Sequence, residues 1–302
     1  APAALDDGVL LWRAALPPGH SSPVVWGERI YLTAAEGGSR ADAGREKVVD
    51  EGGTLWTYCI DRRNGELLWK REAPRPRLER YQPTNSPASP TPAVDARGVY
   101  VFFGDYGLLA YDHQGAERWR HPLGPFNNVN GHGSSPIVAD GKVVLICDQD
   151  TDSYLLALRA ADGKVAWTAD RSEVTRSYTT PALYEPPAGP AQLIVPGAYT
   201  VASYDLATGE KLWWVRGLSW QPKSTPVVSG GWIWINSWEG GGGSAETEVP
   251  TFEQMLARAD TDRDGRISPS ELASVEPKTR FEHADLGSDG YLDRRDWDFQ
   301  RA

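Results

Sequence analysis

The chain has 302 residues and a net charge of −10, and it contains 13 Trp, 12 Tyr, 31 Gly and 23 Pro beside a single Met. This composition indicates many short strands separated by turns rather than a helical bundle, so the fold class is expected to be mostly β. No run of about 20 apolar residues occurs, which excludes a membrane-spanning helix. The lack of a basic cluster argues against nucleic acid or an anionic membrane surface as a partner.

The two cysteines say little about the redox compartment, whereas the first residues bear on export. Cys59 and Cys147 are too far apart for a CxxC pair or a compact metal cluster, so we expect two buried free thiols. The start, Ala1-Pro2-Ala3-Ala4, is compatible with a mature terminus left by signal cleavage, although an edited or fragmentary sequence would look the same. We therefore expect a periplasmic or secreted protein.

Two sequence markers repeat along the chain with a period near 45 residues, which is typical of four-stranded propeller blades. The first marker is a Ser/Thr-Pro pair before an apolar strand, and its occurrences are Ser22-Pro23, Thr91-Pro92, Ser135-Pro136, Thr180-Pro181 and Thr225-Pro226. The second is a Gly turn followed by a Trp, and its tryptophans are Trp69, Trp119, Trp167 and Trp213. The unit between markers alternates as four antiparallel strands would, and each Trp is expected to pack between neighbouring blades.

The blade-ending marker resembles that of the pyrroloquinoline-quinone (PQQ) repeat propellers, roughly Ala-x-Asp-x-x-Thr-Gly-x-x-x-Trp. The positions that fit it best are Ser203, Asp205, Thr208, Gly209 and Trp213. The resemblance covers about residues 8–239 and implies a PQQ-like β-propeller, a fold that family members close into a ring of roughly seven or eight blades.

Counting strands gives about four and a half blades in this chain. Val9 to Arg13 is predicted to be an isolated outer strand, four blades follow, and a fifth begins at Thr225-Pro226 and stops after its second strand. An open ring exposes unpaired sheet edges, which soluble proteins normally cover. The propeller is therefore expected to be unclosed, with closure supplied by a longer chain or by a partner.

A different module follows the blades. Residues 240–250 are predicted to be a Gly-rich linker and residues 251–302 an EF-hand pair inserted in blade five. Thr251 to Gln254 form a capping-box start, and residues 260–271, with the sequence DTDRDGRISPSE, match the EF-hand template at loop positions 1, 3, 5, 6, 9 and 12.

The alternating carboxylates of this loop are the ligands that a hard cation such as calcium prefers. The predicted calcium ligands are Asp260, Asp262, Asp264, the Arg266 carbonyl, Ser268 and Glu271. Glu271 would close the cage with both oxygens. Because the helices between the two loops must be short, a structural or buffering site is favoured over a signalling switch.

The second loop, residues 285–296, is degraded because Gly287 replaces the ligand at position 3 and Asp296 replaces the longer Glu. Its candidate ligands are Asp285, Asp289, Tyr291, Asp293 and Asp296. Two interpretations remain open: a weaker calcium site, or a structural partner whose Leu292 pairs with Ile267.

The loops that join one blade to the next are expected to line one mouth of the propeller channel, a natural position for a ligand site. The candidate binding residues are Asn130, His132, Arg176, Tyr178, Trp220 and Lys223, with Arg80 and Tyr81 nearby. His132, in the sequence NGHG, is the strongest single candidate.

Two functions are compatible with these features. The first is a non-catalytic platform that binds a protein or a small ligand, similar to propellers of the outer-membrane assembly machinery. The alternative is a PQQ-dependent dehydrogenase that oxidises an alcohol or a sugar. The resemblance argues against the enzyme, since quinone-dependent alcohol dehydrogenases carry adjacent cysteines and this chain has none. The expected cofactor is calcium, on the basis of the EF-hand loop. PQQ is a possible cofactor without support from the sequence, and no catalytic residue is assigned.

Overall fold

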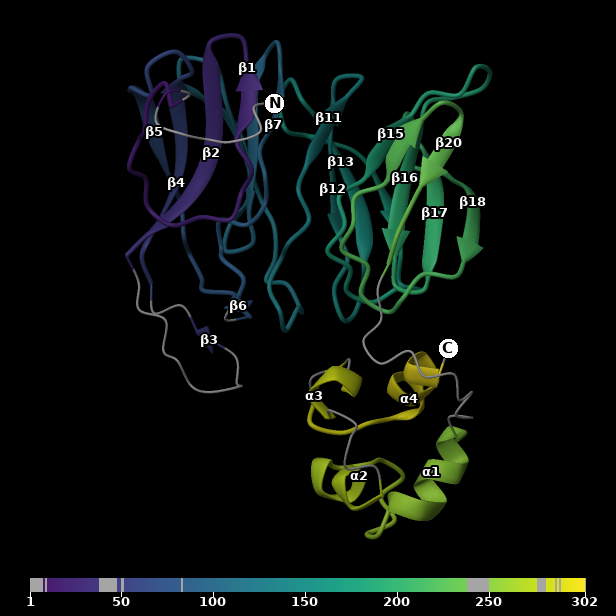
Figure 1. The fold of residues 1–302 in the computed structure, drawn as a ribbon. Coiled ribbons are helices and arrows are strands. Elements are labelled where there is room, and N and C mark those ends of the chain that lie inside the picture. The colour runs from purple at the N-terminus through teal and green to yellow at the C-terminus, as the bar shows by residue number, and fades with distance from the viewer. Residues whose placement is uncertain are drawn as a thin grey trace. The chain divides into compact units, whose positions relative to one another are not determined.

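The computed structural model describes residues 8, 10–37, 48–49, 52–82, 84–237, 250–275, 281–285, 287 and 289–301. The chain divides into two compact units, Ala1–Trp238 and Glu239–Ala302. The first unit is built of strands and the second of helices (Figure 1). Apart from Pro250, the linker predicted at 240–250 lies outside the described residues.

The strand unit contains four four-stranded antiparallel sheets, here called blades one to four, which stand side by side (Figure 1). Blade one consists of β1 (Val24–Trp26), β2 (Arg29–Glu36), β4 (Thr54–Asp61) and β5 (Leu67–Ala73). Blade two consists of β7 (Ala93–Asp95), β8 (Gly98–Phe103), β9 (Gly107–Tyr111) and β10 (Glu117–Pro122). Blade three consists of β11 (Ile137–Ala139), β12 (Lys142–Cys147), β13 (Tyr154–Arg159) and β14 (Val165–Asp170). Blade four consists of β15 (Ala182–Tyr184), β16 (Gln192–Gly197), β17 (Thr200–Asp205) and β18 (Lys211–Arg216).

A fifth blade is represented by a hairpin of β19 (Val227–Ser229) and β20 (Trp232–Trp234), and β3 (Val48–Val49) pairs with β6 (Arg80–Tyr81) beside blade one. The fold is therefore mostly β, an unclosed propeller of about four and a half blades, as predicted. One detail of the prediction is wrong: residues 10–13, the described part of the expected outer strand Val9 to Arg13, form no strand. No strand in the described part of the chain pairs with this segment.

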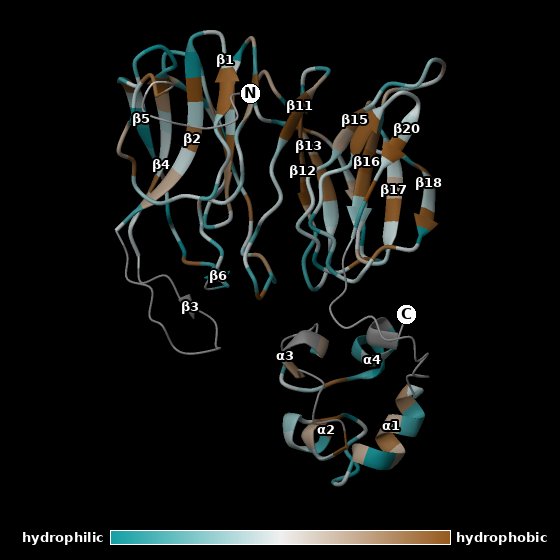
Figure 2. Ribbon diagram, viewed as in Figure 1, coloured by the Kyte–Doolittle hydropathy of each residue, from teal (hydrophilic) through white to brown (hydrophobic). Residues whose placement is uncertain are grey.

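The hydrophobic core lies between the blades. All six residues of β8 are buried, whereas β18 at the end of blade four has no buried residue. A strand with both faces buried requires a neighbouring layer on each side, and β8 has this because blades one and three flank blade two. Figure 2 shows hydrophobic residues concentrated in strands such as β13 and β17. Both cysteines are free and buried in this core, as expected.

Three of the four repeated tryptophans, Trp69, Trp119 and Trp167, pack against the Gly turn of the next blade, which confirms the predicted packing role for them, whereas the indole nitrogen of Trp213 donates to Gln192 of its own blade. The ideal Cβ position at Gly163 is only 2.6 Å from Cδ2 of Trp119, and Gly163 has a φ of +70°. The Trp119 indole nitrogen donates a hydrogen bond of 3.0 Å to the carbonyl of Ala160 in the same turn. The other stacked pairs are Trp12 on Gly65, Trp69 on Gly115 and Trp167 on Gly209.

Trp12 explains why the first segment resembles an outer strand in sequence. Its indole nitrogen donates to the Arg62 carbonyl at 2.9 Å, and its ring covers Gly65 as the outer-strand tryptophans cover the later turns. The segment therefore makes the packing contact of a preceding blade without the hydrogen-bonded ladder of one.

The Ser/Thr-Pro pairs link the first strands of successive blades. The backbone N–H of Ser22 donates to Oγ1 of Thr91 at 2.9 Å, and the N–H of Thr91 donates to Oγ of Ser135 at 2.9 Å. The N–H of Ser135 continues the series to Oγ1 of Thr180 at 3.1 Å. Each hydroxyl thus satisfies a backbone donor that has no strand partner.

His132, a candidate residue for the ligand site at the propeller mouth, lies in the hydrophobic core. Its side chain is 3% exposed and contacts Phe126 and Phe102 edge to face, with ring centroids 4.1 and 5.2 Å apart. Burial, and secondarily the charge of Arg77, lowers the pKa of His132 to about 3. The imidazole is therefore neutral in the folded protein near neutral pH.

The helical unit contains α1 (Phe252–Ala259), α2 (Pro269–Val275), α3 (Phe281–Ala284) and α4 (Arg294–Arg301). The expected capping box at Thr251 and Gln254 is present, and Phe252, Met255 and Ala259 of α1 face a small core with Trp297 of α4. The two loops between these helices pair through Ile267 and Leu292, the contact named in one of the two interpretations of the second loop. None of the described helices is long and apolar enough to cross a membrane.

The packing of Trp rings on the Gly turns predicts that one added methyl group in such a turn lowers the stability of the propeller. Gly163→Ala should destabilise the propeller by about 2–4 kcal/mol, because the new methyl combines a left-handed backbone with overlap on Trp119. Gly141→Ala is the matched control: its φ is +68° and nothing lies within 4 Å of its Cβ position, so only the backbone cost of about 1–2 kcal/mol applies. Urea unfolding of both variants measures the difference, and equal losses would show that the stack does not restrict the turn.

The buried imidazole predicts a pH dependence of stability. In the unfolded chain His132 titrates near its ordinary pKa of 6.5, so between that pH and about 3 the unfolded state binds one more proton than the folded state. The free energy of unfolding should therefore fall as the pH is lowered below 6.5, by up to about 1.4 kcal/mol per pH unit from this group. His132→Gln should flatten that part of the curve in urea titrations at a series of pH values, and parallel curves would contradict the assignment.

Candidate functional site

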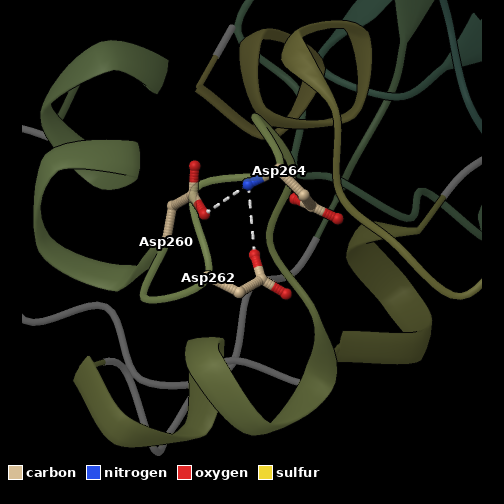
Figure 3. A group of neighbouring side chains, drawn as sticks. All are labelled: Asp260, Asp262 and Asp264. Atoms are coloured by element: carbon tan, nitrogen blue, oxygen red, sulfur yellow. Dashed lines mark hydrogen bonds between the residues drawn. The ribbon is translucent and has the colours of Figure 1, made fainter.

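Three carboxylates converge in the loop that follows α1. Asp260, Asp262 and Asp264 each place a carboxylate oxygen within 4.8 Å of the others (Figure 3). The N–H of Asp264 donates to one oxygen of Asp260 and to one of Asp262, both at 3.1 Å. Gly265, with a φ of +83°, makes the turn and donates its N–H to the second oxygen of Asp260 at 3.0 Å. The loop backbone therefore holds three anionic groups together that would otherwise repel each other.

Glu271, at the far end of the loop, is held by donors from the same loop. One carboxylate oxygen accepts from the N–H and hydroxyl of Thr261 at 2.7 and 2.8 Å. The other accepts from the N–H and hydroxyl of Ser268 at 2.9 and 2.8 Å. The bonds from Ser268, followed by those from Thr261, lower the pKa of Glu271 to about 2, so this carboxylate is ionised near neutral pH.

The donor set of the first loop fits a hard divalent cation. The candidate ligand atoms are all oxygens, from carboxylates, the Ser268 hydroxyl and the Arg266 carbonyl, which is the preference of calcium. The role of Thr261 in orienting Glu271 was not anticipated, because position 2 of such a loop supplies no ligand in the template.

The second loop repeats part of this hydrogen-bond pattern. One oxygen of Asp285 accepts from the N–H of Asp289 at 3.2 Å and the other from the N–H of Gly290 at 2.9 Å. Asp289 accepts from the N–H of Tyr291 at 3.0 Å. Asp293 and Asp296 bond to each other's backbone at 3.0 and 2.9 Å at the start of α4.

Gly287 contributes no side-chain oxygen to the second loop. A Cβ at this position would lie 4.0 Å from a carboxylate oxygen of Asp285 and 3.9 Å from the carboxyl carbon of Asp289. A longer side chain there would therefore start beside the two aspartates that correspond to Asp260 and Asp264. In its described residues, the second loop thus repeats backbone hydrogen bonds of the first but has no side-chain oxygen at position 3.

Arg266 and Tyr291 join the two loops through their side chains. The Arg266 guanidinium lies 3.9 Å from the centroid of the Tyr291 ring and 3.6 Å from a carboxylate oxygen of Asp264. From the sequence, both residues are predicted only as candidate ligands, Arg266 through its carbonyl. Their side chains instead stack across the short ribbon formed by Ile267 and Leu292.

A second candidate site lies in the strand unit, where four blade-connecting loops meet around a pocket of about 440 Å³. Each of the four loops supplies at least one lining residue, and the set is Gln82, Thr84, Asn85, Asn130, Gly133, Tyr178, Gln221 and Lys223. Three predicted residues, Asn130, Tyr178 and Lys223, are thus brought together. The other lining residues were missed, although they occupy the same connecting loops.

The other candidate binding residues do not line this pocket. They are Arg176, Trp220 and His132, with the neighbouring Arg80 and Tyr81. Arg176 is 1% exposed, forms an ion pair with Asp150 and lies over the Trp220 ring, 5.5 Å from its centroid. His132 lies in the core described above, and the buried Tyr81 donates its hydroxyl to Asp105 at 2.8 Å. Arg80 is exposed on β6 and does not line the pocket. These side chains support or flank the mouth and do not contact the pocket.

Comparison with known proteins gives a family and several similar folds. The family model described as outer membrane protein assembly factor BamB matches residues 3–132 and 52–225. No curated protein sequence matches the chain.

Among solved structures, BamB from Moraxella catarrhalis is 15% identical with a TM-score of 0.44, covering 68% of this chain and 59% of that chain. A quinohemoprotein alcohol dehydrogenase from Pseudomonas putida HK5 is 18% identical with a TM-score of 0.46, covering 68% and 36%. A europium-containing methanol dehydrogenase is 13% identical with a TM-score of 0.49, covering 74% and 44%.

The chain spans less than two thirds of the length of each of these structures. The family match, by contrast, extends over more than half of this chain and coincides with the four blades. The chain therefore belongs to the family of PQQ-type propeller proteins whose model is described as outer membrane protein assembly factor BamB.

Proposed function

We propose that this protein is a calcium-binding β-propeller that acts as a non-catalytic binding platform. The observation that carries the calcium assignment is the convergence of Asp260, Asp262 and Asp264 in a loop whose last residue is the ionised Glu271. The helical unit is then an EF-hand pair, with calcium bound in loop 260–271 and bound more weakly in loop 285–296. A bound calcium ion would attract the loop carboxylates and offset their mutual repulsion, and so would stabilise the small helical core.

The platform role is supported by the pocket at the meeting point of four loops. Its described lining contains amides, hydroxyls and one ammonium group, but no carboxylate or imidazole that could serve as a general base. This lining does not favour a PQQ-dependent dehydrogenase, in which a carboxylate acts on the alcohol. The propeller is therefore assigned to binding a protein or a small ligand, and calcium to the helical unit.

The family and the exposed surface support the proposed kind of partner and the proposed compartment. The hairpin of blade five exposes Trp232 and Trp234 by 68% and 62%, and Trp214 of blade four is 57% exposed. Comparable surfaces between the inner blades are covered, so we expect a further blade, from a longer chain or from a partner, to cover this one. A periplasmic or secreted location agrees with a family described by outer-membrane assembly.

Calcium titration calorimetry on the whole chain tests the first loop. We expect saturable uptake, and Glu271→Gln should weaken the tighter site by roughly tenfold or more, because it removes a charged ligand that closes the loop. Glu28→Gln in the strand unit is the matched control, since Glu28 pairs with Arg62 and belongs to neither loop, so its loss should leave the affinity unchanged. Absence of binding heat at millimolar calcium would overturn the assignment.

The second loop predicts a gain of function from one substitution. Gly287→Asp should supply the missing carboxylate beside Asp285 and Asp289, and so raise the affinity of loop 285–296 by roughly tenfold or more. The measurement is the same titration in the Glu271→Gln background, where the second loop dominates the signal. If Gly287→Asp binds no more tightly than its parent, the second loop is a structural partner only.

A further inference from the structure

The pocket at the mouth of the propeller carries one unneutralised charge. Lys223 forms no ion pair among the described residues, and no carboxylate occurs in the described lining. Its ammonium group makes only a long hydrogen bond of 3.4 Å to the Gln221 carbonyl and lies 6.0 Å from the Tyr178 ring centroid. A lysine without a counter-ion at the edge of a pocket is available for an anionic group of a ligand.

A second donor beside Lys223 also lacks a partner. The side-chain nitrogen of Gln221 is buried, lines the same pocket and donates no hydrogen bond in the described structure. A buried amide donor without a partner is unfavourable, so an acceptor that reaches this nitrogen would be favourable. Gln221 and Lys223 therefore present two donors, one of them charged, on the same connecting loop.

The other described side chains of the pocket lining carry no ionisable acid or base except Tyr178, and several of them bond to one another. The Asn130 amide nitrogen donates to the Tyr178 hydroxyl at 2.7 Å, and the Gln82 amide nitrogen donates to Oδ1 of Asn130 at 2.7 Å. Asn85 donates to the Asn130 carbonyl at 2.9 Å. Burial raises the pKa of Tyr178, so its hydroxyl stays protonated and adds no negative charge near Lys223.

These features define the chemistry of a ligand. Amide side chains offer both a donor and an acceptor, which is what a hydroxyl group needs, and here they come from loops whose geometry is fixed by mutual hydrogen bonds. The volume of about 440 Å³ is within the range of small-molecule sites. A ligand that satisfies both sides carries one carboxylate and several hydroxyls.

We propose that this pocket binds a small hydroxylated carboxylate of the sugar-acid class, with its carboxylate on Lys223 and Gln221 and its hydroxyls on the amides of Gln82 and Asn130. This inference rests on the proposed role of the propeller as a binding platform and names the ligand class for it. The ion pair with the exposed Lys223 is screened by salt, so the affinity falls as the ionic strength rises.

The experiment is calorimetry of the whole chain with D-glucuronate and D-glucose, which share a pyranose ring and differ in the carboxylate. Glucuronate is expected to bind with a Kd of about 1 mM or tighter and glucose roughly tenfold more weakly. Lys223→Gln should weaken glucuronate binding roughly tenfold and leave glucose unchanged. Lys164→Gln, which removes an exposed lysine outside the pocket lining, is the control and should have no effect.

Three outcomes overturn the inference: no glucuronate binding at millimolar concentration, equal affinity for both sugars, or an affinity that Lys223→Gln does not change. Calcium uptake is measured on the same sample. Loss of sugar-acid binding with intact calcium uptake rejects only the ligand class, whereas missing calcium uptake with intact sugar-acid binding rejects only the metal assignment.

Discussion

The stacking of an outer-strand tryptophan on the glycine turn of the next blade is the contact on which the rest of the propeller depends. The contact needs three features together: a large flat ring, a turn residue without a Cβ, and a carbonyl placed to accept from the indole nitrogen. Trp69, Trp119 and Trp167 meet all three on successive blades, with indole hydrogen bonds of 3.0 to 3.1 Å. Because the same contact recurs with each blade, the connecting loops emerge at one mouth and can form a shared pocket.

The two candidate sites differ in the sign of their charge. In the helical unit, backbone N–H groups hold three aspartates together, and the proposed ligand there is a cation. At the propeller mouth, neutral amides surround Lys223, and the buried charges nearby are paired, as Arg176 is with Asp150. Lys223 has no ion-pair partner among the described residues, and the proposed ligand carboxylate would supply one.

Much of the fold could be predicted from the sequence because the markers that repeat are the residues that make the contacts between blades. Thr91 and Ser135 mark strand starts because their hydroxyls accept from neighbouring backbones, and Trp119 marks a strand end because Gly163 receives its ring. The pocket was harder to predict, since whether a polar loop residue faces the channel or the core depends on tertiary packing. His132 and Tyr178 both lie in such loops, yet one packs against Phe126 in the core and the other lines the pocket.

The most direct test of the account is a crystal structure of the chain grown in millimolar calcium, with anomalous scattering used to identify the ion. We expect a peak in loop 260–271, ligated by the side chains of Asp260, Asp262 and Asp264, with Glu271 turned from Thr261 towards the ion. A loop without a peak, in which Glu271 keeps its hydrogen bonds to Thr261 and Ser268, would contradict it.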